Sequence, residues 1–410
     1  MDRNTRWFEL LQSKRRILAD QLKDPAAVGL WKSVIDKYSD NAHFVYELLQ
    51  NADDAEATCV KVYLGADVLE FVHNGKVLFS LSDPDKEGDK SSSGIGHINA
   101  ITSIGSSTKV EGNKIGKFGV GFKSVFKYTD QPHIEDDNYS FDIVDYIVPQ
   151  TTHRVSAHRA NGETSFFFPI KESKLNMPII RDKFISLINP LLFLVSLSKI
   201  LIYENNELIF FYDKACKDSW RADDVNCSFI ETKTPKADTY FYLHSTLVEN
   251  HSIANAIYSN EDGELDVIHN DDPAYCFFPT KEHLNLNHIV HAPFLLTESR
   301  ENIKMNEQWN DLLFRQLGLL FVKSIVSLTK RKTLQGMPVV GDNVFCLFPI
   351  VSAENPFVRL FKSSMKGYLN NAPIFLLADG SYENASHIVF TREKELTSLF
   401  VNSLLSILTI

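Results

Sequence analysis

The chain has 410 residues, of which 44% are hydrophobic and 23% charged, and its formal net charge is -10. This composition is typical of a globular protein, and the length predicts two or three domains. The acidic balance argues against a dedicated nucleic-acid-binding protein, which normally presents a basic face. Five scattered cysteines without a Cys-x-x-Cys pair indicate a reducing compartment and give no metal-binding framework.

The hydropathy of the chain predicts no membrane segment. The N-terminus, Met1-Asp2-Arg3-Asn4, is polar and leads into no apolar signal segment. The longest apolar run, near Pro190, is well short of the ~20 residues that a membrane helix needs. We therefore expect a cytoplasmic protein that does not associate with membranes.

The first forty residues predict two helices. Apolar residues at helical spacing among basic ones predict an amphipathic helix over residues 5 to 23. Asp24-Pro25 then predicts the cap and first turn of a second helix. These helices either pack onto the first domain or form the contact of a homodimer, and their pattern is compatible with both.

A third predicted helix, over residues 42 to 57, has an unusual polar stripe. Glu47, Asn51 and Asp54 follow one another at i, i+4 and i+7 beside an apolar stripe. A stripe of this kind is most often a solvated helix face. The composition is less ordinary, because no Lys or Arg occurs between Asp40 and Val60.

Two strands and two polar segments follow. The runs 58 to 64 and 68 to 73 predict strands, and the second ends at His73-Asn74-Gly75, where Asn-Gly is typical of a hairpin turn. Residues 82 to 94 are rich in turn formers and predict a surface loop. A short helix over 97 to 104 then leads into a second polar segment. Two such segments are suited to form a lid over a ligand.

A glycine-rich stretch, Ile115 to Ser124, is the most distinctive part of the chain. Gly116, Gly119 and Gly121 have the spacing G-x-x-G-x-G, which lets a backbone approach a phosphate closely. Residues 122 to 128 have helical character, so the loop opens a helix whose N-terminus attracts anions. Lys123 adds positive charge nearby.

This stretch differs from two better-known phosphate loops. A dinucleotide-binding fingerprint has its glycines in the order G-x-G-x-x-G, and a Walker loop has Lys directly after its last Gly, where this chain has Phe122. A glycine-rich connection without a ligand is the remaining alternative, and other residues must decide.

The rest of the chain predicts further strands and helices. The expected strands lie at 139 to 148, 153 to 158, 164 to 170 and 200 to 212, with several more and a helix between 227 and 280. The expected helices begin at Arg181 and at Glu307, the second running to Lys330. Gln335 to Pro338 predicts a linker. Beyond it, residues 343 to 410 predict a strand, a helix, two strands and a helix.

The polar helix, the glycine-rich stretch and a later strand beginning at Gly162-Glu163-Thr164 occur in an order that resembles the GHKL ATPase superfamily. Ile115 to Ser124 resembles the glycine loop of the ninety-kilodalton heat-shock chaperones, and Glu47 to Ala55 is similar to the sacsin-type branch. Leu295 to Glu301 resembles the middle-domain segment that carries the catalytic arginine of those chaperones. Asn302-Ile303 and Trp309-Asn310 match further positions of sacsin-type proteins.

The resemblance implies an α+β protein with three regions. Residues 1-205 would form a Bergerat-type ATP-binding α/β sandwich that includes the N-terminal helices. Residues 206-334 would form a middle, transducer-like α/β domain that carries Arg300. Residues 335-410 would form a smaller α/β extension.

The resemblance also implies roles for individual residues. Glu47 would act as the general base, Asn51 would bind Mg²⁺, and Arg300 would neutralise charge on the transferred phosphoryl group. A surface ion pair of Arg300 with Glu298 or Glu301 is the alternative. The other implied nucleotide contacts are Asp54, His73, Asn74, Gly75, Ser107, Lys109, Gly116, Phe118, Gly119, Val120, Gly121, Phe122, Lys123 and Thr164.

The chain departs from the superfamily at the position that reads adenine. The superfamily has an Asp-x-Gly motif at the end of the strand after the Glu helix, where this chain has His73-Asn74-Gly75. Ser93-Gly94-Ile95-Gly96 is a second candidate for that motif. The residue that recognises the base therefore stays open.

By this resemblance the function would be Mg²⁺-dependent ATP binding and hydrolysis, driving lid closure and a conformational cycle. Such a cycle would serve a chaperone-like or signalling or defence multidomain protein, with a homodimer and an unidentified protein client as partners. Two alternatives stay open: an interaction module that binds nucleotide with negligible hydrolysis, and a DNA-acting protein like MutL or a topoisomerase. The second of these uses a lysine where this chain has Arg300, and the acidic balance argues against it.

Overall fold

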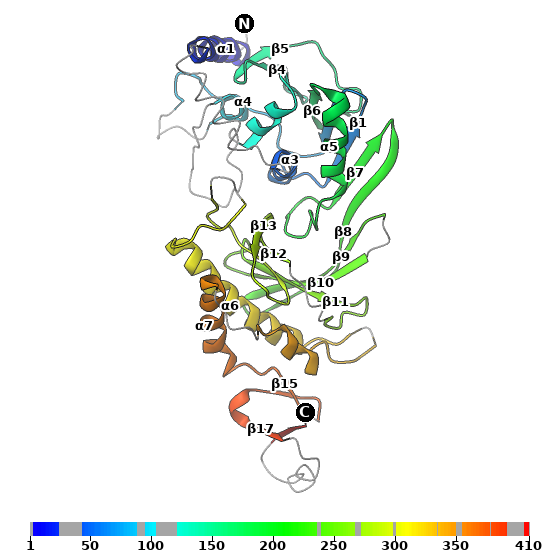
Figure 1. Cartoon of the computed structure of the whole chain (residues 1–410), viewed down its shortest axis with the longest axis vertical. Coiled ribbons are helices and arrows are strands. Elements are labelled where there is room, and N and C mark those ends of the chain that lie inside the picture. Colours follow the sequence, from blue (N-terminus) through cyan, green and yellow to red (C-terminus); the bar gives the residue numbers. More distant parts are fainter. Residues whose placement is uncertain are drawn as a thin grey trace. The chain divides into compact units, whose positions relative to one another are not determined.

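The structure, a computed structural model, describes residues 3–23, 43–87, 95–103, 121–235, 239–266, 272–297, 301–333, 335–349, 355–377, 379–391 and 406–409. These residues form two compact units, shown in Figure 1. The first comprises Met1–Asp213 with Thr234–Ala237, and the second comprises Lys214–Lys233 with Asp238–Ile410.

The first unit is built on a mixed sheet. Its helices are α1 (Arg3–Leu22), α3 (His43–Asp54), α4 (His97–Ile101), the 3₁₀ helix η1 (Gly121–Lys127) and α5 (Ser173–Ile185). Its strands are β1 (Cys59–Leu64), β2 (Val68–His73), β3 (His133–Glu135), β4 (Ser140–Val144), β5 (Val148–Thr151), β6 (Thr164–Pro169), β7 (Lys199–Glu204) and the start of β8 (Glu207–Ala222). The strand order is β8-β7-β1-β2-β6-β3-β4-β5, and every neighbouring pair is antiparallel except β1 and β7.

The two faces of this sheet have different neighbours, because successive side chains of a strand point to opposite faces. On one face, Phe71 of β2 lies beside Phe166 of β6, and both are buried. Phe122 of η1 packs on this face, with its ring centroid 5.9 Å from that of Phe166. Helix α3 packs against η1. This face of the sheet therefore holds the hydrophobic core between the strands and the helices.

Helix α1 is a packing element of the first unit. Phe8, Leu11 and Ala19 on its inner face are buried, and the Phe8 ring meets Phe141 of β4 edge to face at 6.0 Å. Arg15, only 8% exposed, forms an ion pair with Glu87 at 2.9 Å. Packing on the first unit, one of the two roles predicted for this helix, is thus confirmed. The contact of a homodimer remains a prediction. The second predicted helix lies outside the described residues.

The second unit has a mixed sheet and two long helices. Its strands are β9 (Val225–Lys233), β10 (Thr239–Leu247), β11 (Ala254–Ser259), β12 (Pro273–Cys276), β13 (Phe278–His283) and β14 (Ile289–His291), in the order β9-β10-β11-β14-β12-β13. Its helices are α6 (Gln308–Thr329), the 3₁₀ helix η2 (Asp342–Leu347) and α7 (Pro356–Leu369). The last short elements are β15 (Phe375–Leu376), β16 (Tyr382–Glu383), the 3₁₀ helix η3 (Ala385–His387), β17 (Ile388–Thr391) and β18 (Ser406–Thr409).

Helices α6 and α7 lie side by side in this unit (Figure 1). Their close approach depends on Gly318 of α6, since a Cβ atom there would collide with the carbonyl oxygen of Phe361 in α7. Helix α6 is the one described helix long and apolar enough to cross a membrane, but 61% of its most apolar window is buried inside the protein. That burial is what a core helix shows.

The predicted α+β class is confirmed, and so are most of the individual elements. The predicted helix at 42 to 57 is α3, the strands at 58 to 64 and 68 to 73 are β1 and β2, and the long helix is α6. The predicted division into three domains stays a prediction. The structure has two compact units, and α7, which lies within the predicted extension, packs on α6.

Four predictions about secondary structure were wrong. Residues 153 to 158 form no strand, because polar side chains rather than a ladder hold them. No helix occurs among the described residues between 227 and 280, and α5 begins at Ser173 rather than Arg181. Asn74-Gly75 is not a hairpin turn, since β2 pairs with the preceding β1 and with the distant β6.

The core of the second unit contains a histidine without polar partners. His288 is 2% exposed, its ring stacks on Phe321 at 4.6 Å, and neither ring nitrogen has a hydrogen-bond partner among the described residues. Burial lowers the pKa of His288 to about 3, and that of His291 also to about 3. Both side chains are therefore neutral in the folded protein at neutral pH.

We expect the stability of the second unit to fall as the pH drops below about 6.5, the usual pKa of histidine. Below that pH the unfolded chain binds protons that the folded His288 and His291 do not bind until about pH 3. Each histidine then costs about 1.4 kcal/mol per pH unit. Urea midpoints followed by circular dichroism at pH 7.5 and pH 5 measure this loss. His288→Phe should reduce it, and an equal loss in the variant would contradict the assignment.

Candidate functional site

Helix α3 presents the predicted general base, Glu47, and the predicted metal ligand, Asn51, from one side. Glu47 is 9% exposed and Asn51 is 7% exposed, so both lie largely inside the first unit rather than on a solvated face. Asp54 is half-buried. The neighbouring Asp53 has a different role, since its carboxylate accepts hydrogen bonds from the backbone N–H groups of Val195, Ser196 and Leu197 at 2.7–3.1 Å. Asp53 thereby fixes the rotation of α3 about its axis.

The end of the glycine-rich stretch lies directly against Glu47. A Cβ atom added to Gly121 would overlap with both carboxylate oxygens and the carboxylate carbon of Glu47. Only glycine fits there without displacing that side chain. The two features that the sequence analysis singled out separately thus meet at one point in the first unit.

The turn after β2 lies against the C-terminal end of the same helix. A Cβ atom on Gly75 would stand 2.8 Å from the Cβ and from the carbonyl oxygen of Ala55. The Asn74 amide is committed to the start of β1: its Oδ1 accepts from the N–H groups of Thr58 and Cys59, and its Nδ2 donates to the Thr58 hydroxyl. Asn74 therefore holds the turn in place.

His73 and Thr164 form a cross-strand pair at the ends of β2 and β6. They lie on the same sheet face as Phe71 and Phe166, which contact the His73 ring at centroid distances of 6.4 and 6.0 Å. His73 is 3% exposed and Thr164 is 1% exposed. The Thr164 hydroxyl has no hydrogen-bond partner in the part of the chain that the structure describes. Burial lowers the pKa of His73 to about 4.

Two predicted contacts at the start of η1 have internal roles. Phe122 is a core residue between Phe166 and Phe168. The Lys123 ammonium donates to the carbonyl oxygens of Ile101 and Tyr146, at 2.7 Å each. Burial, together with the positive charge of Arg15, lowers the pKa of Lys123 to about 7. The geometry gives both side chains a structural role, and their contact with a nucleotide stays a prediction.

Several predicted site residues lie outside the described residues. They are Ser107, Lys109, Gly116, Phe118, Gly119, Val120 and Arg300, together with Ser93 and Gly94 of the second candidate motif. His73-Asn74-Gly75, the first candidate, lies beside α3 and Thr164.

The described residues on either side of Arg300 are held together by backbone and side-chain contacts in the second unit. Leu296 and Ile303 form an antiparallel bridge that closes the segment. Asn310 of α6, fully buried, braces it: its Oδ1 accepts from Leu295 N–H at 2.8 Å, and its Nδ2 donates to the carbonyl oxygens of Leu295 and Lys304 at 2.9 Å. The sequence singled out Asn310 as a family match but did not reveal this bracing role.

Glu301, which belongs to the ion-pair alternative for Arg300, pairs with Lys281 of β13 at 2.6 Å. Arg300 and Glu298 lie outside the described residues, so that alternative stays open.

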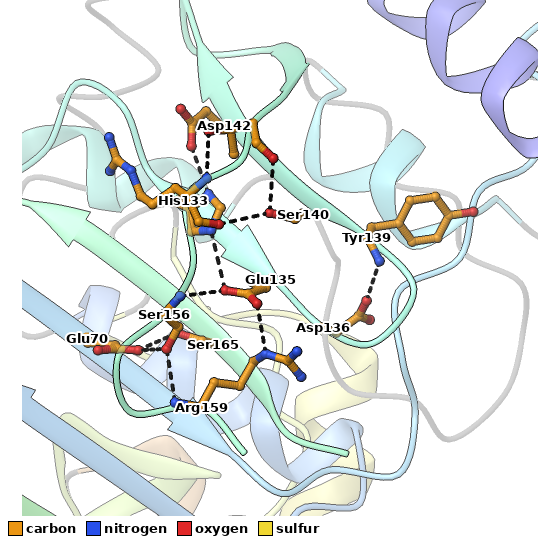
Figure 2. A network of polar contacts seen from close by, with 12 residues as sticks. Glu70, His133, Glu135, Asp136, Tyr139, Ser140, Asp142, Ser156, Arg159 and Ser165 are labelled. Atoms are coloured by element: carbon orange, nitrogen blue, oxygen red, sulfur yellow. Dashed lines mark hydrogen bonds and ion pairs between the residues drawn. The ribbon is translucent and has the colours of Figure 1, made fainter. Parts of the chain in front are cut away.

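The opposite face of the sheet in the first unit carries a second polar network, which sequence analysis missed (Figure 2). The Glu70 carboxylate accepts from the hydroxyls of Ser156 and Ser165, and Glu135 accepts from the Ser156 N–H and pairs with Arg159. Every member of this set has a partner within it. It anchors the loop that precedes β6, and hence the position of Thr164.

The side-chain oxygen that Asn51 offers on α3 suits Mg²⁺ bound to a triphosphate better than a metal ion held by protein side chains alone. No group of three metal-ligating side chains occurs among the described residues. A single amide oxygen, such as that of Asn51, suits Mg²⁺, which keeps several waters and is held mainly by phosphates. The Thr164 hydroxyl has no partner among the described residues, so it could form a hydrogen bond with a second part of a ligand.

Fold and site together define an α+β protein whose polar residues Glu47, Asn51, His73 and Thr164 belong to helix α3 and to the face of the sheet that η1 covers. Protein NO VEIN of Arabidopsis thaliana is 26% identical over 385 residues, covering 83% of this chain and 13% of that protein. Sacsin of Homo sapiens is 32% identical over 123 residues, covering 27% of this chain and 2% of sacsin. The chain thus spans a small part of both relatives. No family model matches it.

The expected likeness to sacsin is thus confirmed for part of the chain. These similarities do not by themselves identify the GHKL superfamily.

We expect Gly121→Ala to destabilise the first unit by at most about 1 kcal/mol, because its methyl group would displace only the end of the flexible Glu47 side chain. Thermal unfolding measures the loss. Combining it with Glu47→Ala should restore part of the stability, as contacting residues are not additive. Gly367→Ala is the matched control, since a Cβ on that exposed glycine meets nothing within 4 Å. If the effects of Gly121→Ala and Glu47→Ala on the free energy of unfolding were additive, the two residues would not be in contact.

Proposed function

We propose that the first unit binds ATP with Mg²⁺ and hydrolyses it, and that the chain is a GHKL ATPase with a Bergerat-type fold. The observation that supports this most strongly is the apposition of Gly121 and Glu47. The end of a glycine-rich stretch next to a buried carboxylate brings together a backbone that can approach a phosphate and a group that can act as a general base.

The proposal gives each described residue a chemical role. Glu47 orients the attacking water and accepts its proton, and Asn51 supplies a neutral oxygen to the metal. Mg²⁺, when bound with the nucleotide, neutralises charge on the phosphates. Asp53 keeps both side chains in place by fixing α3 to residues 195 to 197. Lys123 stabilises the fold beneath η1 through the carbonyl oxygens of Ile101 and Tyr146, and its positive charge lies near the proposed phosphate site.

The second unit contributes Arg300 to the proposal. An arginine that meets the transferred phosphoryl group neutralises charge developing on it.

In the wider proposal, nucleotide binding and release drive lid closure and a conformational cycle. The chain would act as the ATPase part of a larger chaperone-like or signalling or defence protein, as a homodimer with a protein client. The small share of NO VEIN and sacsin that it spans supports a place within a longer protein architecture.

Glu47→Gln should reduce Mg²⁺-dependent phosphate release by about 100-fold or more, since a general base contributes 10²–10⁴-fold. Nucleotide affinity, measured by calorimetry, should change little, because the amide fits the space beside Gly121 as the carboxylate does. Glu56→Gln, an exposed carboxylate just after α3, is the control and should hydrolyse normally. Binding without hydrolysis in the wild type would favour a nucleotide-binding module instead.

Arg300→Ala should lower turnover by several orders of magnitude, as removal of an arginine finger does, while leaving ATP affinity nearly unchanged. Lys304→Ala removes an exposed positive charge from the same segment and serves as the control. Steady-state phosphate release gives the rates. Equal rates in the Arg300 and Lys304 variants would remove Arg300 from the mechanism.

A further inference from the structure

The His73 ring has its hydrogen-bonding direction fixed by the backbone. Gly75 N–H donates to Nδ1 of His73 at 3.1 Å. A backbone N–H can only donate, so Nδ1 must be the unprotonated nitrogen. A neutral imidazole then has its proton on Nε2. His73 is therefore a hydrogen-bond donor at Nε2 and has no acceptor left on its ring.

Protonation of the ring is disfavoured as well. A proton on Nδ1 would face the Gly75 N–H, and burial already lowers the pKa of His73 to about 4. The donor character of Nε2 thus persists at neutral pH. Among the described residues, the bond from Gly75 is the one hydrogen bond of this ring.

Thr164 completes the arrangement across the strands. It is the register partner of His73, it is 1% exposed, and its hydroxyl has no partner in the described part of the chain. A buried hydroxyl without a partner costs free energy, which a ligand atom would recover. Phe71 and Phe166 beside His73 make the surroundings apolar, as suits the flat face of a nucleobase.

We propose that His73 and Thr164 read the base of a purine nucleoside triphosphate through acceptor atoms of the base, so that the 6-amino group of adenine is not recognised. This inference rests on the proposed function. Nε2–H of His73 donates to a ring nitrogen such as N1 of adenine, or equally to the 6-carbonyl oxygen of hypoxanthine. A carboxylate at position 73 would do the opposite, since it accepts from an amino group and repels a carbonyl.

The site is consequently a purine site of low selectivity at position 6. Asn74 does not restore selectivity, because both ends of its amide are engaged by Thr58 and Cys59. The identity of residue 73 then determines which purines the protein accepts.

Calorimetry with Mg²⁺ tests this on the full chain with three nucleotides that share one triphosphate: ATP, ITP and purine riboside triphosphate, which lacks the 6-amino group. The wild type should bind all three within about threefold. His73→Asp should favour ATP over purine riboside triphosphate by about tenfold, the effect of one added hydrogen bond. His73→Asn, which is neutral and also offers an acceptor, should shift the ratio the same way if a buried carboxylate impairs folding.

Thr164→Val tests the second residue. It should weaken all three nucleotides about equally, by roughly tenfold, since the hydroxyl contacts what they share. Thr151→Val, at an exposed position of β5, is the matched control and should leave all three affinities unchanged.

Two results would overturn the inference. The first leaves the proposed ATPase function intact, and the second removes that function as well. Wild-type protein that prefers ATP over purine riboside triphosphate by more than about threefold reads the 6-amino group, and the proposed ATPase would stand while the role of His73 falls. Wild-type protein that binds none of the three nucleotides would remove the proposed function together with this inference.

Discussion

The arrangement of the first unit depends on one contact, the fit of the Glu47 carboxylate against Gly121. Any side chain at residue 121 would occupy the volume of that carboxylate. Phe122, the next residue, is locked between Phe166 and Phe168, so the backbone at Gly121 cannot easily withdraw. Helix α3, the sheet and residues 121 and 122 therefore meet at the point where the proposed chemistry takes place.

The other polar groups of the unit act as supports for this contact. Asp53 fixes α3, Lys123 ties η1 to the carbonyl oxygens of Ile101 and Tyr146, and the Glu70 network on the far side of the sheet holds the loop before Thr164. Each buried charge in these groups has hydrogen-bonding partners, as charges inside proteins require. Among the described site residues, the neutral Thr164 hydroxyl has no partner, and it lies on the strand end that pairs with that of His73.

Both units show how the same residue type serves different ends. His73 has a polar backbone partner and a defined tautomer, which makes its second nitrogen available for recognition. His288 has no polar partner among the described residues and packs against aromatic rings, where it acts as an apolar side chain. The local hydrogen bond, rather than the residue type, decides between the two outcomes.

The sequence by itself determined the α+β class, the helix α3 with Glu47 and Asn51 on one stripe, the strands β1 and β2, and the long helix α6, because these follow from local periodicity and composition. It did not determine which polar side chains face one another. Whether Lys123 meets a phosphate or a carbonyl, whether Asn74 forms a hairpin turn or caps β1, and which atom of His73 is a donor all depend on how the elements pack. Only the tertiary structure decided these points, since hydrogen-bond partners across strands and helices are set by packing rather than by spacing along the chain.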